Sequence, residues 1–463
     1  MQDTPVNPSR SQASPHTRAP DGHAPVVGAS KGRHTRTLVG IGLGNGLESF
    51  DWAAYAVFAP FFATQIFDPA NPAAALIATF AVFGAGFLAR PFGAILFGWL
   101  ADRKGRKFSL VAAVLCASVG LLLIGIAPTY RNSGLTGAAV LLFARLLQGV
   151  AHTGEVAAAY TYIAEVAPAK QRGLWSSSIY VSGLGAVTIA TALGAALASH
   201  LGRAEMAAWG WRVPFIFGAG LGMLTLVLRR KMDETEAFTR QNNARQLGVA
   251  KPSIVRGLWT HRGAGVRVFI LTGANAVFFY SWAVSGPSWA ISVGRLDPVA
   301  ALWAGVIAQT VCLAVLPMFG ALSDKIGRRP SFFIYGIGVA ILAFPLDRLG
   351  RSGVVWEFAL AMTIALVLFA FVGSIFPALL AELFPISIRA SGVAFPYALA
   401  AIAFAGTAPL LQQWLNQHGH GDLFVAYTAG LSLLGAVVMY FTRETKGLDL
   451  SDAKTSHVDA KAR

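Results

Sequence analysis

Twelve apolar stretches of the chain are each long enough to form a helix that crosses a membrane. A helix needs about 20 apolar residues to cross the roughly 30 Å of hydrocarbon in a bilayer. In chain order, the stretches cover 38–62, 76–100, 109–127, 138–164, 174–199, 210–228, 266–293, 299–322, 331–346, 357–381, 390–415 and 422–442. The ninth is the shortest, because Pro345 and Asp347 interrupt it. The sequence therefore predicts an all-α integral membrane protein with twelve transmembrane helices.

Composition excludes several other classes of protein. Of the 463 residues, 55% are hydrophobic and 13% are charged, about half the share of charged residues in soluble proteins. This composition excludes disordered and disulfide-stapled chains and disfavours a nucleic-acid binder, whose basic residues would gather on one polar face. The sequence also lacks metal-ligand spacings and a phosphate-binding GK[ST] loop. We therefore expect no metal, no cofactor, no nucleic-acid partner and no enzymatic activity.

The basic residues, which give the chain a formal net charge of +15, are unevenly placed between the apolar stretches. The loops after even-numbered stretches hold eighteen Lys and Arg residues, and the loops on the opposite side hold six. Loops rich in Lys and Arg stay in the cytoplasm. Both chain ends lie on the same side as the basic loops, so we expect both termini to be cytoplasmic.

Two sequence patterns occur twice along the chain. Residues 98–109 read GWLADRKGRKFS and residues 320–331 read GALSDKIGRRPS, while the Ala-Glu pair at 164–165 with Arg172 recurs at 381–382 with Arg389. The repeat predicts two homologous halves of six helices each. The expected domains are a disordered cytoplasmic tail (1–36), an N-terminal bundle (37–228), a cytoplasmic linker (229–263), a C-terminal bundle (264–442) and a second cytoplasmic tail (443–463).

The repeated loop motif G-x-L-x-D-x-x-G-R-[RK] in a chain of twelve helices resembles the major facilitator superfamily. The stretches GNGLESFD (44–51), FLARPFGA (87–94), ARLLQGVAHTGE (144–155) and AELFPISIRASGV (381–393) are similar to the metabolite:proton symporter branch. That branch includes the α-ketoglutarate, shikimate, citrate and proline/betaine permeases. The resemblance implies two pseudo-symmetric six-helix bundles that alternate access to a site between them.

The resemblance also implies a function and a location. We expect a monomeric secondary active transporter in a bacterial-type inner membrane, whose partners are the bilayer, protons and a small substrate. It would couple proton entry to uptake of a carboxylate such as α-ketoglutarate, another dicarboxylate or citrate. The alternatives are uptake of shikimate or of a zwitterionic osmolyte such as proline or betaine, and drug efflux.

Five ionisable residues lie well inside the predicted spans of the N-terminal half: Glu48, Asp51, Arg90, Arg145 and Glu155. A charge at the bilayer centre costs on the order of 2.5–3.5 kcal/mol, so each of them needs a partner or a task. An acid beside an arginine stays ionised and takes a proton when the arginine turns to a substrate. We predict that Glu48, Asp51 and Glu155 share proton acceptance under the influence of Arg145. A static packing network is the alternative.

Arg90 is predicted to lie near the middle of the membrane and to bind substrate. It precedes Asp102 by twelve residues, or roughly 18 Å of helix, and a guanidinium can hold a carboxylate bidentately. In the resembling carboxylate permeases, an arginine in this stretch is linked to the substrate. A structural ion pair is the alternative role. The other predicted substrate-binding residues are Tyr55, Ser281, Ser285 and Tyr397.

A third group of charged residues occupies the repeated motifs at the predicted cytoplasmic mouth. Ion pairs there can hold one access state closed and break in the other, and the superfamily's loop motif is similarly linked to gating. The predicted gating residues are Asp102, Arg106, Glu165, Arg172, Asp324, Arg328, Glu382 and Arg389. For the basic residues, a role in fixing topology alone is the alternative.

Overall fold

In a computed structural model of the chain, the structure describes residues 31–104, 106–151, 155–230, 254–386, 388–448 and 450, with the side chains of 31–41, 102, 106 and 155 among a few that are not described. The chain divides into two units, 1–40 and 41–463. The described part of the first unit is the beginning of helix α1. The contacts discussed below all lie within the second unit.

The regular elements in the described ranges are all helical. The N-terminal half contains α1 (Lys31–Ile66), α2 (Pro72–Leu88), α3 (Arg90–Lys104), α4 (Arg106–Gly125), α5 (Tyr130–Ser133), α6 (Thr136–Ala151), α7 (Glu155–Val166), α8 (Arg172–Ala208), the short 3₁₀ helix η1 (Gly210–Arg212) and α9 (Val213–Arg230).

The C-terminal half has a similar series of helices. It contains α11 (Ile254–Thr260), α12 (Arg262–Phe279), η2 (Tyr280–Val284), α13 (Gly286–Ser292), α14 (Pro298–Ile326), α15 (Arg328–Gly350), α16 (Val355–Gly373), α17 (Phe376–Glu382), α18 (Arg389–Ala400), η3 (Ala401–Ala405), α19 (Ala408–Gln417) and α20 (Gly421–Tyr440). The elements η2 and η3 are single π-helical turns.

Ten helices of the described part are long and apolar enough to cross a membrane. This finding confirms the prediction of an all-α membrane protein. Two of the twelve predicted spans are not among the ten. One is 38–62, which lies in α1, and the other is 138–164, which falls on α6 and α7 and includes residues 152–154 outside the description.

The ninth predicted span was drawn too short. We expected Pro345 and Asp347 to end it, but α15 continues to Gly350. A proline within a membrane helix is tolerated where neighbouring groups compensate for the lost hydrogen bond. Asp347 is tolerated because its carboxylate pairs with Arg351 one turn later, with 2.5 Å between Oδ2 and Nε.

Several predicted spans are interrupted in the middle, where a continuous helix was expected. The span 76–100 changes from α2 to α3 at Ala89, the span 266–293 contains η2, and the span 390–415 contains η3. Single π-helical turns within α-helices are frequent at functional sites. Arg90, which follows the break at Ala89, and Tyr280 and Ala401, the first residues of η2 and η3, all line one cavity.

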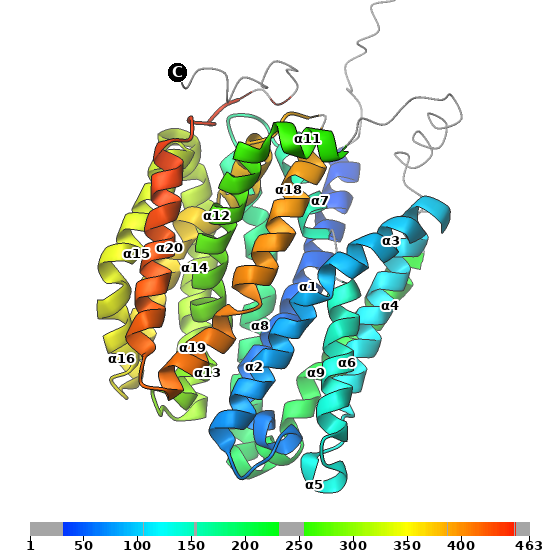
Figure 1. Cartoon of the computed structure of the whole chain (residues 1–463), viewed down its shortest axis with the longest axis vertical. Helices are drawn as coiled ribbons and strands as arrows, with labels where there is room; N and C mark the ends of the chain where they lie inside the picture. Colours follow the sequence, from blue (N-terminus) through cyan, green and yellow to red (C-terminus); the bar gives the residue numbers. More distant parts are fainter. Residues whose placement is uncertain are drawn as a thin grey trace, which may run out of the picture. The chain divides into compact units, whose positions relative to one another are not determined.

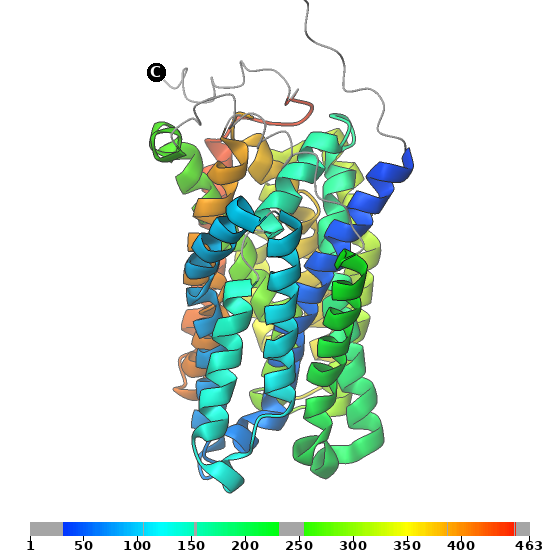
Figure 2. The ribbon, with the colours of Figure 1, turned by 90° about the vertical axis from the view of Figure 1, so that its right-hand side faces the viewer.

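The two halves meet along α8 and α14 and along α2 with η3 and α19 (Figures 1 and 2). The backbones approach closely in both places. A Cβ atom on Gly84 would lie 2.6 Å from the carbonyl oxygen of Gly406, and one on Gly173 would lie 2.5 Å from that of Gly320. Close helix contacts of this kind in membranes depend on small residues.

Candidate functional site

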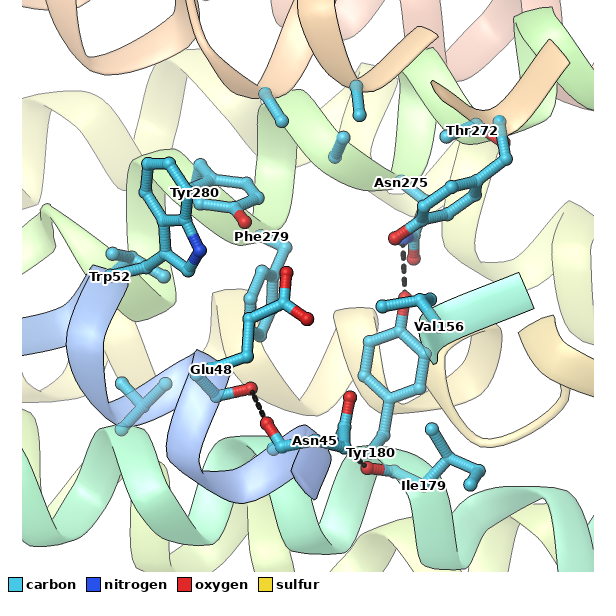
Figure 3. Close-up of a pocket in the computed structure, with 18 of the residues that line it drawn as sticks. Asn45, Glu48, Trp52, Val156, Ile179, Tyr180, Thr272, Asn275, Phe279 and Tyr280 are labelled. Carbon is cyan, nitrogen blue, oxygen red and sulfur yellow. Dashed lines mark hydrogen bonds between the residues drawn. The ribbon is translucent and has the colours of Figure 1, made fainter. Parts of the chain in front are cut away.

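A cavity of about 80 Å³ lies between the two halves. Its walls come from α1, α7 and α8 of the N-terminal half and from α12, η2 and α18 of the C-terminal half, with Arg90 at the start of α3. Figure 3 shows the carboxylate of Glu48 pointing into this space, with Trp52 and Tyr280 on one side and Asn275 and Tyr180 on the other. The side chains that line it combine two charged groups with aromatic rings and neutral polar groups.

The two charged groups form an ion pair on the cavity wall. The Nη2 atom of Arg90 lies 3.0 Å from Oε1 of Glu48, and each residue is 6% exposed. The guanidinium also lies over the rings of Phe87, at 4.3 Å, and Trp52, at 5.2 Å. Oε2 of Glu48 and Nε of Arg90 are buried and have no hydrogen-bond partner among the described residues. The pair therefore keeps unused bonding capacity at the cavity.

A second buried ion pair lies behind the first. Nη1 of Arg145 is 3.3 Å from Oδ1 of Asp51, which also accepts a 2.8 Å hydrogen bond from the Gln148 amide. The guanidinium lies 3.9 Å from the ring centroid of Tyr55. Among the described residues, none of these four lines the cavity. Of the predicted proton-coupling residues, Glu48 thus lies at the cavity, and Asp51 and Arg145 form a pair enclosed in the bundle. The side chain of Glu155 lies outside the described residues.

A cluster of neutral polar groups forms another part of the wall. The Nδ2 group of Asn275 donates a 2.7 Å hydrogen bond to the hydroxyl of Tyr180 (Figure 3), and this bond links the two halves. The ring of Tyr160 packs against that of Tyr397, with 5.6 Å between the ring centroids, and both residues line the cavity. Tyr397 was predicted at the site, but Tyr160 and Tyr180 were missed, because isolated tyrosines on apolar helices give no sequence signal for convergence.

Three predicted substrate-binding residues lie elsewhere in this conformation. The hydroxyl of Tyr55 donates to the Thr79 carbonyl at 3.0 Å, that of Ser281 to the Val277 carbonyl, and that of Ser285 to the Tyr280 carbonyl. In the part of the chain that the structure describes, none of the three lines the central cavity. Hydroxyls in membrane helices commonly bond to backbone carbonyls of the preceding turn, which accounts for the two serines.

At the upper end of the bundle in Figure 1, the repeated motifs form reciprocal contacts between the halves. Arg172 lies 3.2 Å from Glu382, and Arg389 lies 3.0 Å from Glu165. The Nε groups of both arginines also donate to the equivalent alanine carbonyls, at 164 and 381. The repeat found in the sequence thus corresponds to a repeated arrangement of contacts.

Asp324 connects the halves in a second way. Its two carboxylate oxygens accept hydrogen bonds from the amides of Gly173, at 2.8 Å, and Leu174, at 2.9 Å, in the first turn of α8. A carboxylate is favoured at the N-terminus of a helix. Arg328 pairs with Asp324 at 2.9 Å and with Glu382 at 3.4 Å, which joins the two sets of contacts. The side chains of Asp102 and Arg106, also predicted here, lie outside the described residues.

Residues 443–448 and 450, predicted as part of a tail, are bound to this end of the bundle. Glu444 accepts hydrogen bonds from the amides of Arg328, at 2.8 Å, and Arg329, at 3.0 Å, in the first turn of α15. Burial raises the pKa of Glu444, but its backbone hydrogen bonds outweigh burial and hold the pKa below its ordinary value. The hydroxyl of Thr445 donates to Glu382 at 2.5 Å. Sequence reasoning missed this segment because it follows the last apolar stretch.

The halves also touch at the lower end of the bundle. The Ser288 hydroxyl of α13 donates to the Ala56 carbonyl of α1, and the Gln417 amide of α19 donates to the Ala73 carbonyl at 3.1 Å. Contacts between the halves therefore exist both above and below the cavity.

Comparison with known proteins agrees with this architecture. The model of the family described as "Sugar (and other) transporter" matches residues 38–260 and 266–456. The α-ketoglutarate permease of Escherichia coli K12 is 35% identical over 421 residues, which cover 90% of this chain and 96% of the permease. A citrate-proton symporter of Klebsiella pneumoniae is 29% identical, over 90% of this chain and 95% of that protein.

The fold is also found among solved structures. The proton:xylose symporter XylE, a member of the major facilitator superfamily, superimposes with a TM-score of 0.67 over 90% of this chain and 97% of that one, at 21% sequence identity. This likeness concerns the fold. The family match and the similarity to the permease show that the chain belongs to the sugar (and other) transporter family.

Proposed function

We propose that this protein couples the entry of protons to the uptake of a small carboxylated metabolite. The observation that carries the proposal is the Glu48–Arg90 pair on the cavity wall, with bonding capacity left on both partners. When an acid that is paired with an arginine takes a proton, the arginine becomes available to bind a carboxylate of the substrate. Each partner is held on a different helix, α1 or α3, within reach of the cavity.

The coupling follows from the charge on Glu48. While Glu48 is ionised, it occupies the guanidinium of Arg90 at 3.0 Å. When Glu48 takes a proton, the attraction weakens and Arg90 is available for a substrate carboxylate, which it can bind through two parallel hydrogen bonds. Release of the substrate returns Arg90 to Glu48 and expels the proton. Asp51 contributes less to proton coupling, because its carboxylate is already paired with Arg145 and hydrogen-bonded to Gln148.

The contacts at the upper end form the gate. The reciprocal pairs of Arg172 with Glu382 and Arg389 with Glu165 join the halves and must separate when that end opens. Loops rich in Lys and Arg face the cytoplasm, so we assign the upper end, and with it both termini, to the cytoplasmic side of a bacterial inner membrane. The protein would act as a monomer, since the cavity lies within one chain.

The named relatives suggest the substrates to test first. They include an α-ketoglutarate permease, citrate-proton symporters and a putative proline/betaine transporter of Staphylococcus haemolyticus. An osmolyte is the second candidate, because Glu48 with the rings of Trp52 and Tyr280 could hold an onium group. Drug efflux has no support in a cavity of about 80 Å³, which gives room for several water-sized groups at roughly 10–15 Å³ each.

Uptake by proteoliposomes would test the proposal. Radiolabelled α-ketoglutarate, citrate, shikimate and betaine would be offered with and without an imposed pH gradient, acidic outside. We expect carboxylate accumulation that is lost when an ionophore collapses the gradient. Accumulation of betaine alone, or of a carboxylate without any effect of the gradient, would overturn the proposal.

The variant Arg90→Lys tests the assigned ligand. Lysine keeps the charge but loses the planar fork, so carboxylate uptake should fall at least about tenfold through a higher KM. The control is Arg203→Lys, because Arg203 pairs with Asp297 at an exposed position at the lower end. It should transport like the wild type.

A further inference from the structure

The cavity has a charged end and an uncharged end. At the charged end, Glu48 and Arg90 form an ion pair. At the uncharged end lie Asn275 on α12, which donates to the hydroxyl of Tyr180 on α8, and the cavity-lining residues Tyr160 and Tyr397 on α7 and α18. Among the described side chains that line the cavity, Glu48 and Arg90 are the two that carry a full charge. The site therefore offers a single cation to a substrate.

The uncharged end has free hydrogen-bonding capacity of its own. Oδ1 of Asn275 and Oγ1 of Thr272 are buried and have no hydrogen-bond partner among the described residues. Asn275 is 4% exposed and Thr272 is 1% exposed, and both line the cavity. Buried polar groups are nearly always bonded. An acceptor oxygen beside tyrosine hydroxyls suits a hydroxyl, carbonyl or protonated carboxyl group of a ligand and repels an ionised carboxylate.

We propose that the transported species carries a single negative charge, with its carboxylate on Arg90 and an uncharged polar group on the Asn275–Tyr180 cluster. This inference rests on the function proposed above and narrows its substrate class. A monocarboxylate with a hydroxyl or carbonyl group at its far end meets the requirement directly. A dicarboxylate meets it as its singly protonated form, because a second ionised carboxylate would be buried without a cation, at a high cost.

The same count of charges predicts the electrical character of transport. In the empty carrier, ionised Glu48 and Arg90 sum to zero. In the loaded carrier, protonated Glu48, Arg90 and one carboxylate also sum to zero. One proton enters with each monoanion, so each cycle moves no net charge. Uptake should respond to a pH gradient and be insensitive to membrane potential. A dianion carried with one proton would instead move one negative charge per cycle.

The described groups that surround Glu48 do not change this sum of charges. Besides Arg90 on α3, the titratable side chains that line the cavity with it, among those the structure describes, are Tyr160, Tyr180, Tyr280 and Tyr397, on α7, α8, η2 and α18. A tyrosine hydroxyl has an ordinary pKa of about 10 and is neutral near pH 7. The Arg145–Asp51 pair behind the wall contributes no net charge.

Three ligands of similar size separate charge from hydrogen bonding: α-ketoglutarate, its 5-methyl ester and 2-oxohexanoate. The first is a dianion at pH 7.5, the second a monoanion with a polar far end, and the third a monoanion with an apolar far end. They would compete with a labelled substrate for uptake by proteoliposomes. We expect the methyl ester to bind at least about tenfold more tightly than α-ketoglutarate at pH 7.5, and binding of α-ketoglutarate to strengthen as the pH falls. Equal binding of dianion and monoanion at pH 7.5 would overturn the proposal.

Variants of the uncharged end test its role in selection. Tyr180→Phe and Asn275→Leu should abolish the preference for the methyl ester over 2-oxohexanoate and keep transport of 2-oxohexanoate. The matched control is Tyr335→Phe, because the Tyr335 hydroxyl donates to the Ala274 carbonyl, and Tyr335 is buried and does not line the described cavity. It should leave the preference unchanged. A preference that survives in both Tyr180→Phe and Asn275→Leu would remove the cluster from the substrate site.

A measurement of charge movement separates failure of this inference from failure of the proposed function. A valinomycin-clamped membrane potential should leave the uptake rate of the methyl ester within about twofold, while the pH gradient changes it severalfold. Carboxylate uptake that depends on both the pH gradient and the potential would overturn the single-charge inference and leave proton-coupled carboxylate transport standing. Absence of any carboxylate uptake would overturn the proposed function itself.

Discussion

The guanidinium of Arg172 lies 3.2 Å from the carboxylate of Glu382, which belongs to the other half of the chain. In the corresponding pair, the C-terminal half supplies the arginine, Arg389, and the N-terminal half supplies the acid, Glu165, at a distance of 3.0 Å. The two contacts are not equivalent in their surroundings. Glu382 is buried and also bonds to Arg328 and Thr445, whereas the Glu165 side chain is 44% exposed. The proposed gate thus has a buried contact and a partly exposed one at equivalent positions.

This asymmetry predicts different effects of two matched substitutions. Glu382→Gln leaves Arg172 and Arg328 buried without their shared anion, and breaking a buried pair costs about 3–5 kcal/mol. Glu165→Gln should cost at most about 1 kcal/mol, as for exposed pairs. Hydrogen exchange of the amides at 173 and 174 reports opening of the upper end, since both bond to Asp324. We expect faster exchange in Glu382→Gln and little change in Glu165→Gln; equal effects would show that burial does not set the strength of the gate.

Glu48→Gln should uncouple transport from the pH gradient. The amide cannot take a proton from the cavity, and it holds Arg90 less strongly than the carboxylate does. Accumulation driven by the gradient should fall at least about tenfold, while exchange of internal for external substrate continues. In proteoliposomes, uptake under an imposed pH gradient measures the first activity, and counterflow without a gradient measures the second. The control is Glu205→Gln on the exposed end of α8, which should accumulate substrate normally. Retention of full gradient-driven accumulation in Glu48→Gln would mean that another group takes the proton.

Asp51→Asn should affect stability more than substrate binding. Arg145 is fully buried and would lose its anion, which should lower the free energy of unfolding by about 3–5 kcal/mol. A fall in the melting temperature of the detergent-solubilised protein would show this effect. The double variant Asp51→Asn, Arg145→Gln should recover part of the loss, because it leaves no unpaired charge. A wild-type melting temperature in Asp51→Asn would contradict a structural role for the pair.

Glu444 should make the bound tail sensitive to acid. Its pKa is held below the ordinary range in the folded protein, so its stabilising contribution is complete above about pH 4.3, the unfolded value. That contribution is lost as the pH falls through the lower folded value. Between pH 6 and pH 3, the melting temperature of wild type should therefore drop more than that of Glu444→Gln. Parallel curves for the two proteins would show that the caps on α15 do not depend on the ionised carboxylate.

The sequence predicted the class of fold, while the gating role of the repeated motifs stays a prediction. Hydropathy defines the spans because a bilayer accepts only long apolar helices, and the repeated motifs placed Arg172, Glu382 and their counterparts at one end of the bundle. The interruptions at Ala89, η2 and η3 were missed. They do not alter hydropathy, and they depend on how neighbouring helices pack.

The site itself was only partly predictable. Arg90 and Glu48 stood out because a charge in an apolar span is rare. Their direct contact could not be read from the sequence, since they lie on different helices 42 positions apart. Ser281 and Ser285 were chosen for their polarity, but a hydroxyl can bond to its own helix and leave no trace of this in the sequence. Tyr160 and Tyr180 line the cavity because the two halves pack against each other there, and the sequence does not show how the halves pack.

The bound segment of residues 443–448 and 450 has a consequence for the speed of the carrier. Arg172 of the N-terminal half donates to the carbonyl of Leu448, and Arg389 of the C-terminal half donates to that of Leu450. Each half is therefore hydrogen-bonded to the same short segment. When the halves separate at this end, at least one of these two hydrogen bonds must break. Its loss adds to the free-energy barrier of the conformational change and does not alter the cavity. Changes in this segment should therefore alter the turnover number at saturating substrate and leave the affinity intact, so that the segment would set the rate of the transport cycle without taking part in binding.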